Sequence, residues 1–440
     1  MAGFLAFLGL LLGPGVSSHE VLDLDLGKAV RLAMEKNLEI VNSMLDVEAS
    51  GAEERSALGR FLPSLSMGIS QSIHDRSRMV LSGTRGLVKT NRSYSLNLGL
   101  NYNIFNGFKD ISSLKAAKLL REASELTYER TKEEVALIVV QRYLACLKAE
   151  KLVDIARQAM ERSKVQLERT ELMFKLGSVP QADVIKQRVQ FGREKLKLLQ
   201  AKMEYQSSLA ELLYVLGVEA EGRRVRLEDV QELGGNVEMD FEEAFRTALE
   251  RRKDILALKK ALEAARYELK AAKGALLPTI DASVSYGFWD VSLPRSFRDI
   301  DRTDNISFGI ALRVPIFQRL QARSAVAEAE INLRKLENQL KDVERKVALE
   351  IRTRLMELKM SKENIELARE NLRAAEEDLR LAEERYRLGA GILLDRIMAS
   401  LQRREAEADY VDARYSYILS KVRLEGAMGM LELPGLQGRR

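Results

Sequence analysis

Four segments of the chain alternate between apolar residues and small or polar residues. They cover residues 64–74, 94–104, 280–289 and 305–314. Within the second segment, Leu96, Leu98 and Leu100 are separated by asparagine and glycine. A period of two residues predicts β-strands with one apolar face and one polar face. Each segment is about ten residues long, which is the length of a tilted transmembrane strand.

The alternation leaves two interpretations of these strands open. If the strands span a membrane, their apolar faces contact lipid and the faces rich in serine and asparagine line a watery lumen. If they do not, they form two soluble hairpins that pack on one face. A secretory signal and the polar inner face favour the membrane-spanning arrangement, with polar loops at 75–93 and 290–305. The lipid-facing candidates are then Leu96, Leu98, Leu100, Ile310 and Leu312.

After each pair of strands, the hydrophobic period changes to that of a long helix. Residues 107–175 and 319–387 contain no proline and almost no glycine, and apolar residues in the second run recur at steps of three and four. Sustained heptads of this kind predict coiled coils, each about 100 Å long at the helical rise per residue. Both runs end at a Leu-Gly pair, and returning helices are expected at 183–216 and 395–428.

The two halves of the chain are similar in sequence. Leu62-Pro63 aligns with Leu277-Pro278 at a displacement of 215 residues, and Gly177 aligns with Gly389 at a displacement of 212. Two consistent displacements over this length indicate an internal duplication. Each half is expected to contain short helices, a strand hairpin, a long helix and a returning helix. The expected segments are a first repeat at 19–225, a second repeat at 226–433 and a short C-terminal tail at 434–440.

The N-terminal segment predicts an export signal. Residues 1–16 are almost all apolar, and small residues follow up to Ser18. This run is too short for a transmembrane helix, which needs about 20 residues. We therefore predict a signal peptide at 1–18, although no basic residue precedes the apolar run. The alternative is a buried N-terminal segment.

Composition narrows the chemistry that the chain can perform. It has 70 basic and 65 acidic residues along 440 positions, and the net charge is +5. Interspersed charges indicate solvated helices rather than a nucleic-acid-binding surface. The two histidines and the single cysteine, Cys146, offer little material for a metal centre or a nucleophilic catalytic group. We predict a protein that is not an enzyme and has no cofactor, metal or nucleic acid.

Several short motifs occur in the same order in both halves and carry a resemblance to a known family. They are the helix–Leu-Pro–strand passages at 59–70 and 274–285, the segment 314–317 before the second long helix, and the turn at 386–389 followed by Asp395. In these motifs and in their duplication, the chain resembles the TolC family of outer-membrane efflux proteins. The resemblance covers almost the whole of the chain after residue 18.

The resemblance implies a mainly helical fold with a transmembrane β part. It implies a homotrimer whose long helices form an α-barrel tunnel through the periplasm. Four strands from each chain would complete one shared 12-stranded barrel in outer-membrane lipid, because four strands alone leave open edges. The implied function is a passive exit duct of a tripartite efflux or type I secretion system. The implied partners are a periplasmic adaptor of the membrane-fusion type and an inner-membrane transporter.

The resemblance also implies that partners dock at the tip of the helices. The turns at Gly177 and Gly389 form this tip, and family members hold acidic residues there that narrow the pore. Asp395 matches that position, and Asp183 is its counterpart in the first half. The alternative role for both residues is to stabilise a helix start.

A second function class is a periplasmic coiled-coil adaptor without a membrane barrel. Such a protein also has a secretion signal and a long helical hairpin. It would carry one hairpin together with soluble β-domains, whereas this sequence predicts two long-helix units that each follow a pair of strands. The duplication therefore favours the channel.

Overall fold

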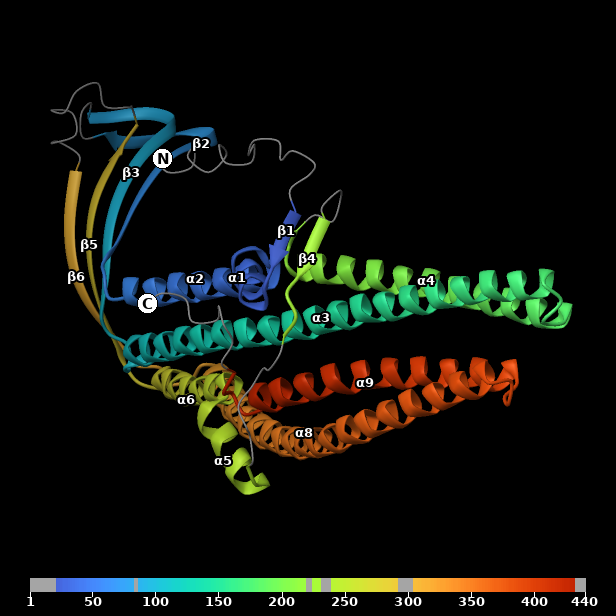
Figure 1. Ribbon diagram of the computed structural model, residues 1–440. Helices are drawn as coiled ribbons and strands as arrows, with labels where there is room; N and C mark the ends of the chain where they lie inside the picture. The colour runs from blue at the N-terminus through green and yellow to red at the C-terminus, as the bar shows by residue number, and fades with distance from the viewer. Residues whose placement is uncertain (1–20, 83–85, 219–223, 231–238, 292–303, 432–440) are drawn as a thin grey trace. The chain divides into compact units, whose positions relative to one another are not determined.

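Figure 1 shows a computed structural model of the chain. It describes residues 21–82, 86–218, 224–230, 239–291 and 304–431. The predicted signal peptide at 1–18, the tail at 434–440 and most of the predicted loop at 290–305 lie outside these residues. Contacts within the chain define two units. The helical unit comprises residues 1–43, 128–253 and 344–440, and the sheet unit comprises 44–127 and 254–343.

The same succession of elements occurs in both halves, as the internal duplication predicts. The first half contains α1 (Leu26–Lys36), α2 (Leu38–Gly59), β2 (Ser64–Ser82), β3 (Gly86–Phe105), α3 (Lys109–Lys175) and α4 (Gln181–Val215). The second half contains α5 (Phe241–Arg251), α6 (Lys253–Gly274), β5 (Thr279–Asp290), β6 (Asp304–Arg313), α8 (Gln321–Arg387) and α9 (Leu393–Ala427). The predicted mainly helical fold is confirmed.

The two halves also share a specific interaction. Asn37, between α1 and α2, donates its side-chain amide to the carbonyl of Val215 at 3.0 Å. Arg252, between α5 and α6, donates a guanidinium N–H to the carbonyl of Ala427 at 3.1 Å. Both carbonyls belong to the last residue of a returning helix. Each half therefore ties its first helices to the end of its returning helix, where backbone carbonyls lack helical partners.

The sheet unit contains one four-stranded antiparallel sheet in the order β2-β3-β5-β6 (Figure 1). All four predicted strands are present. The predicted loop at 75–93 is wrong, because β2 continues to Ser82 and β3 begins at Gly86. Between Ile73 and Arg78, β2 advances five residues while β3 advances two. This bulge interrupts the two-residue period on which the strand prediction depends.

The starts of the long and returning helices differ from the predicted ones by two residues, whereas their ends agree to within one residue. The long helices begin at Lys109 and Gln321, because the two residues before each of them have positive φ values between 49° and 68°. Such values lie outside the right-handed helical region. The returning helices begin earlier than predicted, at Gln181 and Leu393. A difference of one or two residues is ordinary at helix ends, because the terminal turns of a helix fray.

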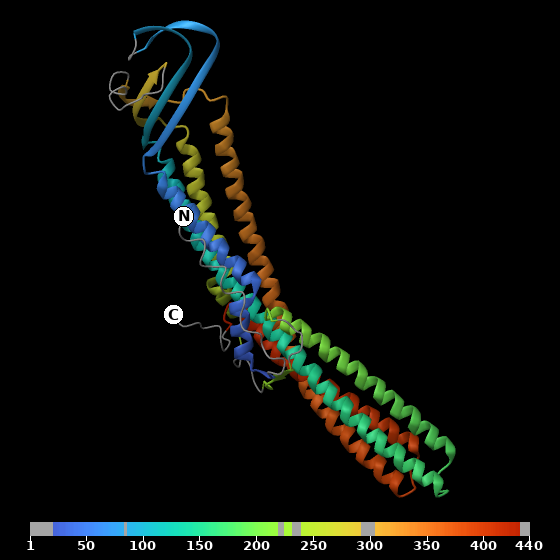
Figure 2. The ribbon, with the colours of Figure 1, turned by 90° about the horizontal axis from the view of Figure 1, so that it is seen from above.

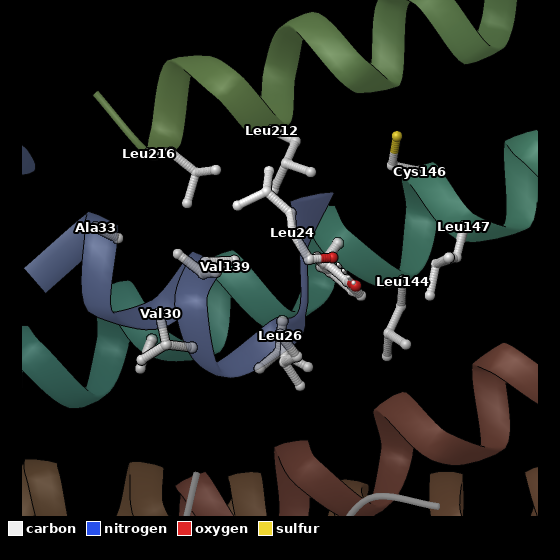
Figure 3. Close-up of a cluster of buried hydrophobic side chains, with 14 of the residues drawn as sticks. Leu24, Leu26, Val30, Ala33, Val139, Leu144, Cys146, Leu147, Leu212 and Leu216 are labelled. Carbon is white, nitrogen blue, oxygen red and sulfur yellow. Dashed lines mark hydrogen bonds between the residues drawn. The ribbon is translucent and has the colours of Figure 1, made fainter. Parts of the chain in front are cut away.

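In the helical unit, α3 and α4 form one hairpin, and α9 forms a second one with the part of α8 that belongs to this unit. The two hairpins lie side by side (Figures 1 and 2). The apolar core of this unit gathers side chains from α1, α3, α4 and α9. Figure 3 shows members from α1, α3 and α4. Its largest fully buried members include Tyr143, Leu147, Leu212 and Leu216. Burial of side chains of this size stabilises a fold by about 1.5–3 kcal/mol each.

A short two-stranded parallel sheet lies against this core and was not predicted. It consists of β1 (Val21–Leu24) and β4 (Arg224–Leu227). The Tyr143 hydroxyl lies 2.9 Å from the carbonyl oxygen of Leu24 and 2.8 Å from that of Glu228. A buried hydroxyl needs such partners, so Tyr143 fixes both strands to α3. The predicted repeat boundary at 225/226 falls within β4.

Candidate functional site

The register of the sheet collects small polar side chains on one face. Ser66 pairs with Gly99, Gly99 with Ser285, and Ser285 with Ser307, so one row crosses all four strands. The hydroxyl oxygens of Ser285 and Ser307 lie 2.7 Å apart. Adjacent rows contain Asn97 and other asparagine, serine and glycine residues. This polar face is suited to contact with water.

The opposite face of the sheet is apolar. Leu65 pairs with Leu100, Leu100 with Val284, and Val284 with Phe308. The five residues predicted to face lipid all lie on this face: Leu96, Leu98, Leu100, Ile310 and Leu312. In the single chain, Leu65 is 67% exposed and Phe308 is 69% exposed. A continuous exposed apolar surface of this kind marks contact with a membrane or with another protein.

The sheet has two strands that lack a partner on one side. Among the described strands, β2 pairs only with β3, and β6 pairs only with β5. The outer edges of β2 and β6 therefore present unpaired backbone N–H and C=O groups. In water such edges recruit further strands, and in lipid they are not tolerated. Both outer edges of the described sheet are therefore open to pairing with a further strand.

Each long helix ends at a glycine in the left-handed conformation. Gly177 and Gly389 both have a φ of 72°. The N–H of Gly177 bonds to the carbonyl of Phe174, and the N–H of Ser178 bonds to that of Met173, both at 2.9 Å. The equivalent pair of bonds closes α8 at Gly389. These are Schellman motifs, which favour glycine because it adopts positive φ without strain.

Asp183 and Asp395 occupy equivalent positions in the first turns of α4 and α9. Neither residue is the helix cap, because Pro180 and Ile392 stand there. Asp183 lies 3.6 Å from the ammonium group of Lys186, whereas Asp395 is exposed. Within the part of the chain that the structure describes, no hydrogen bond or ion pair joins the two carboxylates. The helix dipole stabilises both, and Asp395 is the one open to solvent.

The sequence analysis missed a polar cluster in the seam between the two hairpins. Arg404 of α9 and Glu194 of α4 form an ion pair there, with the guanidinium nitrogen 2.6 Å from the carboxylate oxygen. Both side chains are buried. Gln190 donates to the other oxygen of the same carboxylate at 2.6 Å. The sequence did carry a signal for this cluster. Gln187 and Glu194 follow the same helical spacing as the apolar residues Val184 and Leu198, and all four side chains are buried.

Other site chemistry is limited. Within the described ranges, no three His, Cys, Asp or Glu side chains are arranged to hold a metal ion. None of the described helices combines the length and the apolar character needed to cross a membrane. Cys146 is buried, and burial raises the pKa of its thiol to about 12. A thiol that stays protonated at neutral pH is a poor nucleophile.

Comparison with known proteins gives a consistent result. The family model described as outer membrane efflux protein matches residues 29–218 and 244–430. The chain is 22% identical over 438 residues to the outer membrane protein TolC of Escherichia coli K12, covering 96% of this chain and 86% of that protein. It is 23% identical over 418 residues to the alkaline protease secretion protein AprF of Pseudomonas aeruginosa, covering 92% and 84%.

The fold is likewise similar to a solved structure. The crystal structure of the Campylobacter jejuni CmeC outer membrane channel superposes on this chain with a TM-score of 0.79. That match covers 92% of this chain and 85% of the CmeC chain, at 20% sequence identity. The similarity in fold therefore extends over both halves of the duplication.

Proposed function

The chain belongs to the outer membrane efflux protein family, and we propose that three copies of it assemble into one channel. The protein is an outer-membrane channel of an efflux or secretion system. Family membership confirms the predicted localisation and the prediction that the protein is not an enzyme. It does not favour the alternative, a periplasmic adaptor.

The two-faced sheet with open edges is the observation that supports the trimer. A chain with four strands cannot close a membrane barrel, because outer-membrane barrels have at least about eight strands. Three copies supply 12 strands, and the outer edge of β2 in one copy then pairs with the outer edge of β6 in the next. In this arrangement the apolar face contacts lipid and the serine- and asparagine-rich face lines the lumen.

The helical hairpins form the periplasmic part of the proposed channel. Their Gly177 and Gly389 turns are the docking site for a periplasmic adaptor of the membrane-fusion type and an inner-membrane transporter. The exposed Asp395 carboxylates of three copies face the pore and narrow it, and Asp183 contributes less because Lys186 offsets its charge. The protein acts as a passive duct that receives substrate from the pump.

Conductance across a planar lipid bilayer tests this proposal. The purified detergent-solubilised protein is expected to produce discrete conductance steps that favour cations over anions, because carboxylates at a constriction attract cations. A protein that inserts into the bilayer without producing steps would contradict the proposal.

The role of Asp395 is tested in the same measurement. Asp395→Ala should weaken the cation preference or raise the conductance. Asp409→Ala is the control, because it removes the same charge from an exposed site on α9 about 20 Å further along the helix. If Asp395→Ala and the control both leave selectivity and conductance unchanged, Asp395 only stabilises the start of α9.

A further inference from the structure

The hairpin of β2 and β3 continues beyond the part of the sheet that β5 covers (Figure 1). β3 pairs with β5 from Phe105 to Tyr94, and its described residues before Tyr94 pair with β2. Since β2 follows α2 and β3 precedes α3, this end of the hairpin is the one remote from those helices. The described residues of this end, 73–82 and 86–93, include one acidic side chain, Asp75, and four basic ones: Arg76, Arg78, Lys89 and Arg92.

Arg92 stands directly beyond the apolar band of β3. On the apolar face of this strand, Tyr94 and Tyr102 flank three leucines. The two tyrosines are separated by about 27 Å along the strand, or about 21 Å across a membrane at a tilt of about 40°. Aromatic residues flank an apolar band of about 25 Å in outer-membrane barrels. Arg92 is the next residue on this face after Tyr94, about 7 Å further along the strand, which is the depth of the lipid headgroups in the proposed channel.

The bulge in β2 brings Arg78 to the same face. Ile73 pairs with Arg92 and Arg78 pairs with Thr90, so β2 advances five residues where β3 advances two. Because side chains alternate along a strand, a regular β2 would place Arg78 on the face opposite to Ile73. With the bulge, Arg78 shares the face of Thr90 and Arg92. Redirecting a side chain in this way is a recurrent role of β-bulges.

The two arginines are neighbours, and both are open to a ligand. Arg78 and Arg92 occupy diagonal positions on the paired strands, where Cα atoms lie about 7–8 Å apart. Both are exposed, and neither forms an ion pair with an acidic side chain among the residues that the structure describes. Asp290 pairs with Tyr94, but its side chain is 1% exposed and accepts a hydrogen bond from the N–H of Val291 at 2.7 Å. The four basic side chains still outnumber the acidic ones at this end of the described sheet, which are Asp75, Asp290 and Asp304.

Two adjacent guanidinium groups are suited to a phosphate group. Each presents parallel N–H donors that match two phosphate oxygens, and two positive charges match a phosphate monoester. The pair continues the apolar face beyond Tyr94, which favours a phosphate carried by a lipid over one that is free in solution. We propose that Arg78 and Arg92 together bind the phosphate group of an anionic lipid in the outer leaflet, an inference that rests on the proposed insertion of the sheet into the membrane.

Native mass spectrometry of the detergent-solubilised full chain tests this site with phosphatidic acid, which carries a phosphate monoester. The wild type should bind phosphatidic acid more tightly than phosphatidylcholine, because the choline group offsets the phosphate charge. Arg92→Gln should weaken the binding of phosphatidic acid by about fivefold, and adding Arg78→Gln should weaken it further. Lys89→Gln is the matched control on the same strand. Lys89 pairs with Met79, one position from Thr90, so it lies on the opposite face, and its loss should leave binding unchanged.

Inorganic phosphate distinguishes the two sources of the same chemistry. An equal concentration of it should not displace phosphatidic acid, because the acyl chains of the lipid also contact the apolar face. Displacement by inorganic phosphate, equal binding of the two lipids, or equal effects of Arg92→Gln and Lys89→Gln would overturn the proposal. The bilayer measurement keeps this failure separate from that of the channel. A chain that produces conductance steps without preferring phosphatidic acid contradicts the lipid site alone, whereas a chain that inserts without steps contradicts the channel and the lipid site with it.

Discussion

At the scale of single residues, Gly107 shows how closely the backbone packs where the sheet gives way to α3. Its φ is 68°, and a Cβ added there would overlap the carbonyl oxygen of Gly274 and lie 2.8 Å from Cβ of Leu277. Gly107→Ala should therefore lower the free energy of unfolding by about 2–5 kcal/mol, from the left-handed conformation and the overlap together. Denaturant titration of the solubilised protein measures this change.

Gly192→Ala is the control for that substitution. Gly192 lies inside α4, and an added Cβ meets no atom within 4 Å. Alanine is favoured over glycine inside a helix by about 1 kcal/mol, so this variant should be slightly more stable than the wild type. Equal effects of the two substitutions would show that the Gly107 backbone is not constrained as described.

The buried ion pair between Glu194 and Arg404 is the second residue-scale determinant. Glu194→Leu leaves the Arg404 guanidinium buried without its carboxylate, which should cost about 3–5 kcal/mol of unfolding free energy. Replacing both residues by leucine should recover most of that loss, since an apolar pair of similar volume is often neutral. A double-mutant cycle measures the coupling between the two residues, and additive effects would contradict it.

An exposed ion pair, Arg188 with Glu171, serves as the control for this prediction. Arg188→Met should lower the free energy of unfolding by less than about 1 kcal/mol.

At the scale of elements, the facing of the strands is the most specific prediction. Leu98 lies on the apolar face and Asn97 on the polar face of β3. Arginine on the lipid side near the midplane costs about 2–4 kcal/mol per chain, so Leu98→Arg should nearly abolish assembly in the outer membrane. Asn97→Arg should be tolerated and should shift conductance instead. Quantifying heat-stable trimer in outer-membrane fractions distinguishes them, and equal tolerance would mean that the strands are not embedded in lipid.

Elements with long, regular periods were predictable from the sequence. The strand faces followed from alternation, the long helices from heptads, and their ends from Gly177 and Gly389. Features that depend on distant pairing were not predictable. The bulge after Ile73 becomes visible only in the register with β3, and each strand of the β1–β4 sheet has only four residues.

The seam cluster was missed for a related reason. Glu194 and Arg404 are 210 residues apart in the chain, and each looks like an ordinary charge on a solvated helix. Only the packing of the two hairpins removes both side chains from water. A polar residue at a seam position of a heptad pattern is therefore a useful signal, but its partner has to come from the structure.

At the scale of the whole molecule, the central claim is that β2 of one chain pairs with β6 of the next. Within a chain, β3 and β5 separate these strands, so they lie about 14 Å apart at ordinary strand spacing. Two cysteines can be bridged only when their Cα atoms are within about 7 Å. A disulfide between β2 and β6 must therefore join different chains. Cys146 does not interfere, because it is buried.

Disulfide cross-linking of the two sheet edges tests this claim most directly. Paired substitutions would combine cysteine at Ser64, Ser66 or Ser70 with cysteine at Asn305 or Ser307, and the protein would be oxidised in outer-membrane fractions. At least one pair is expected to give covalent dimers and trimers on a denaturing gel, with no larger species, and to return to monomer on reduction. Monomer alone for every pair, or a ladder that continues beyond three chains, would contradict the trimeric barrel.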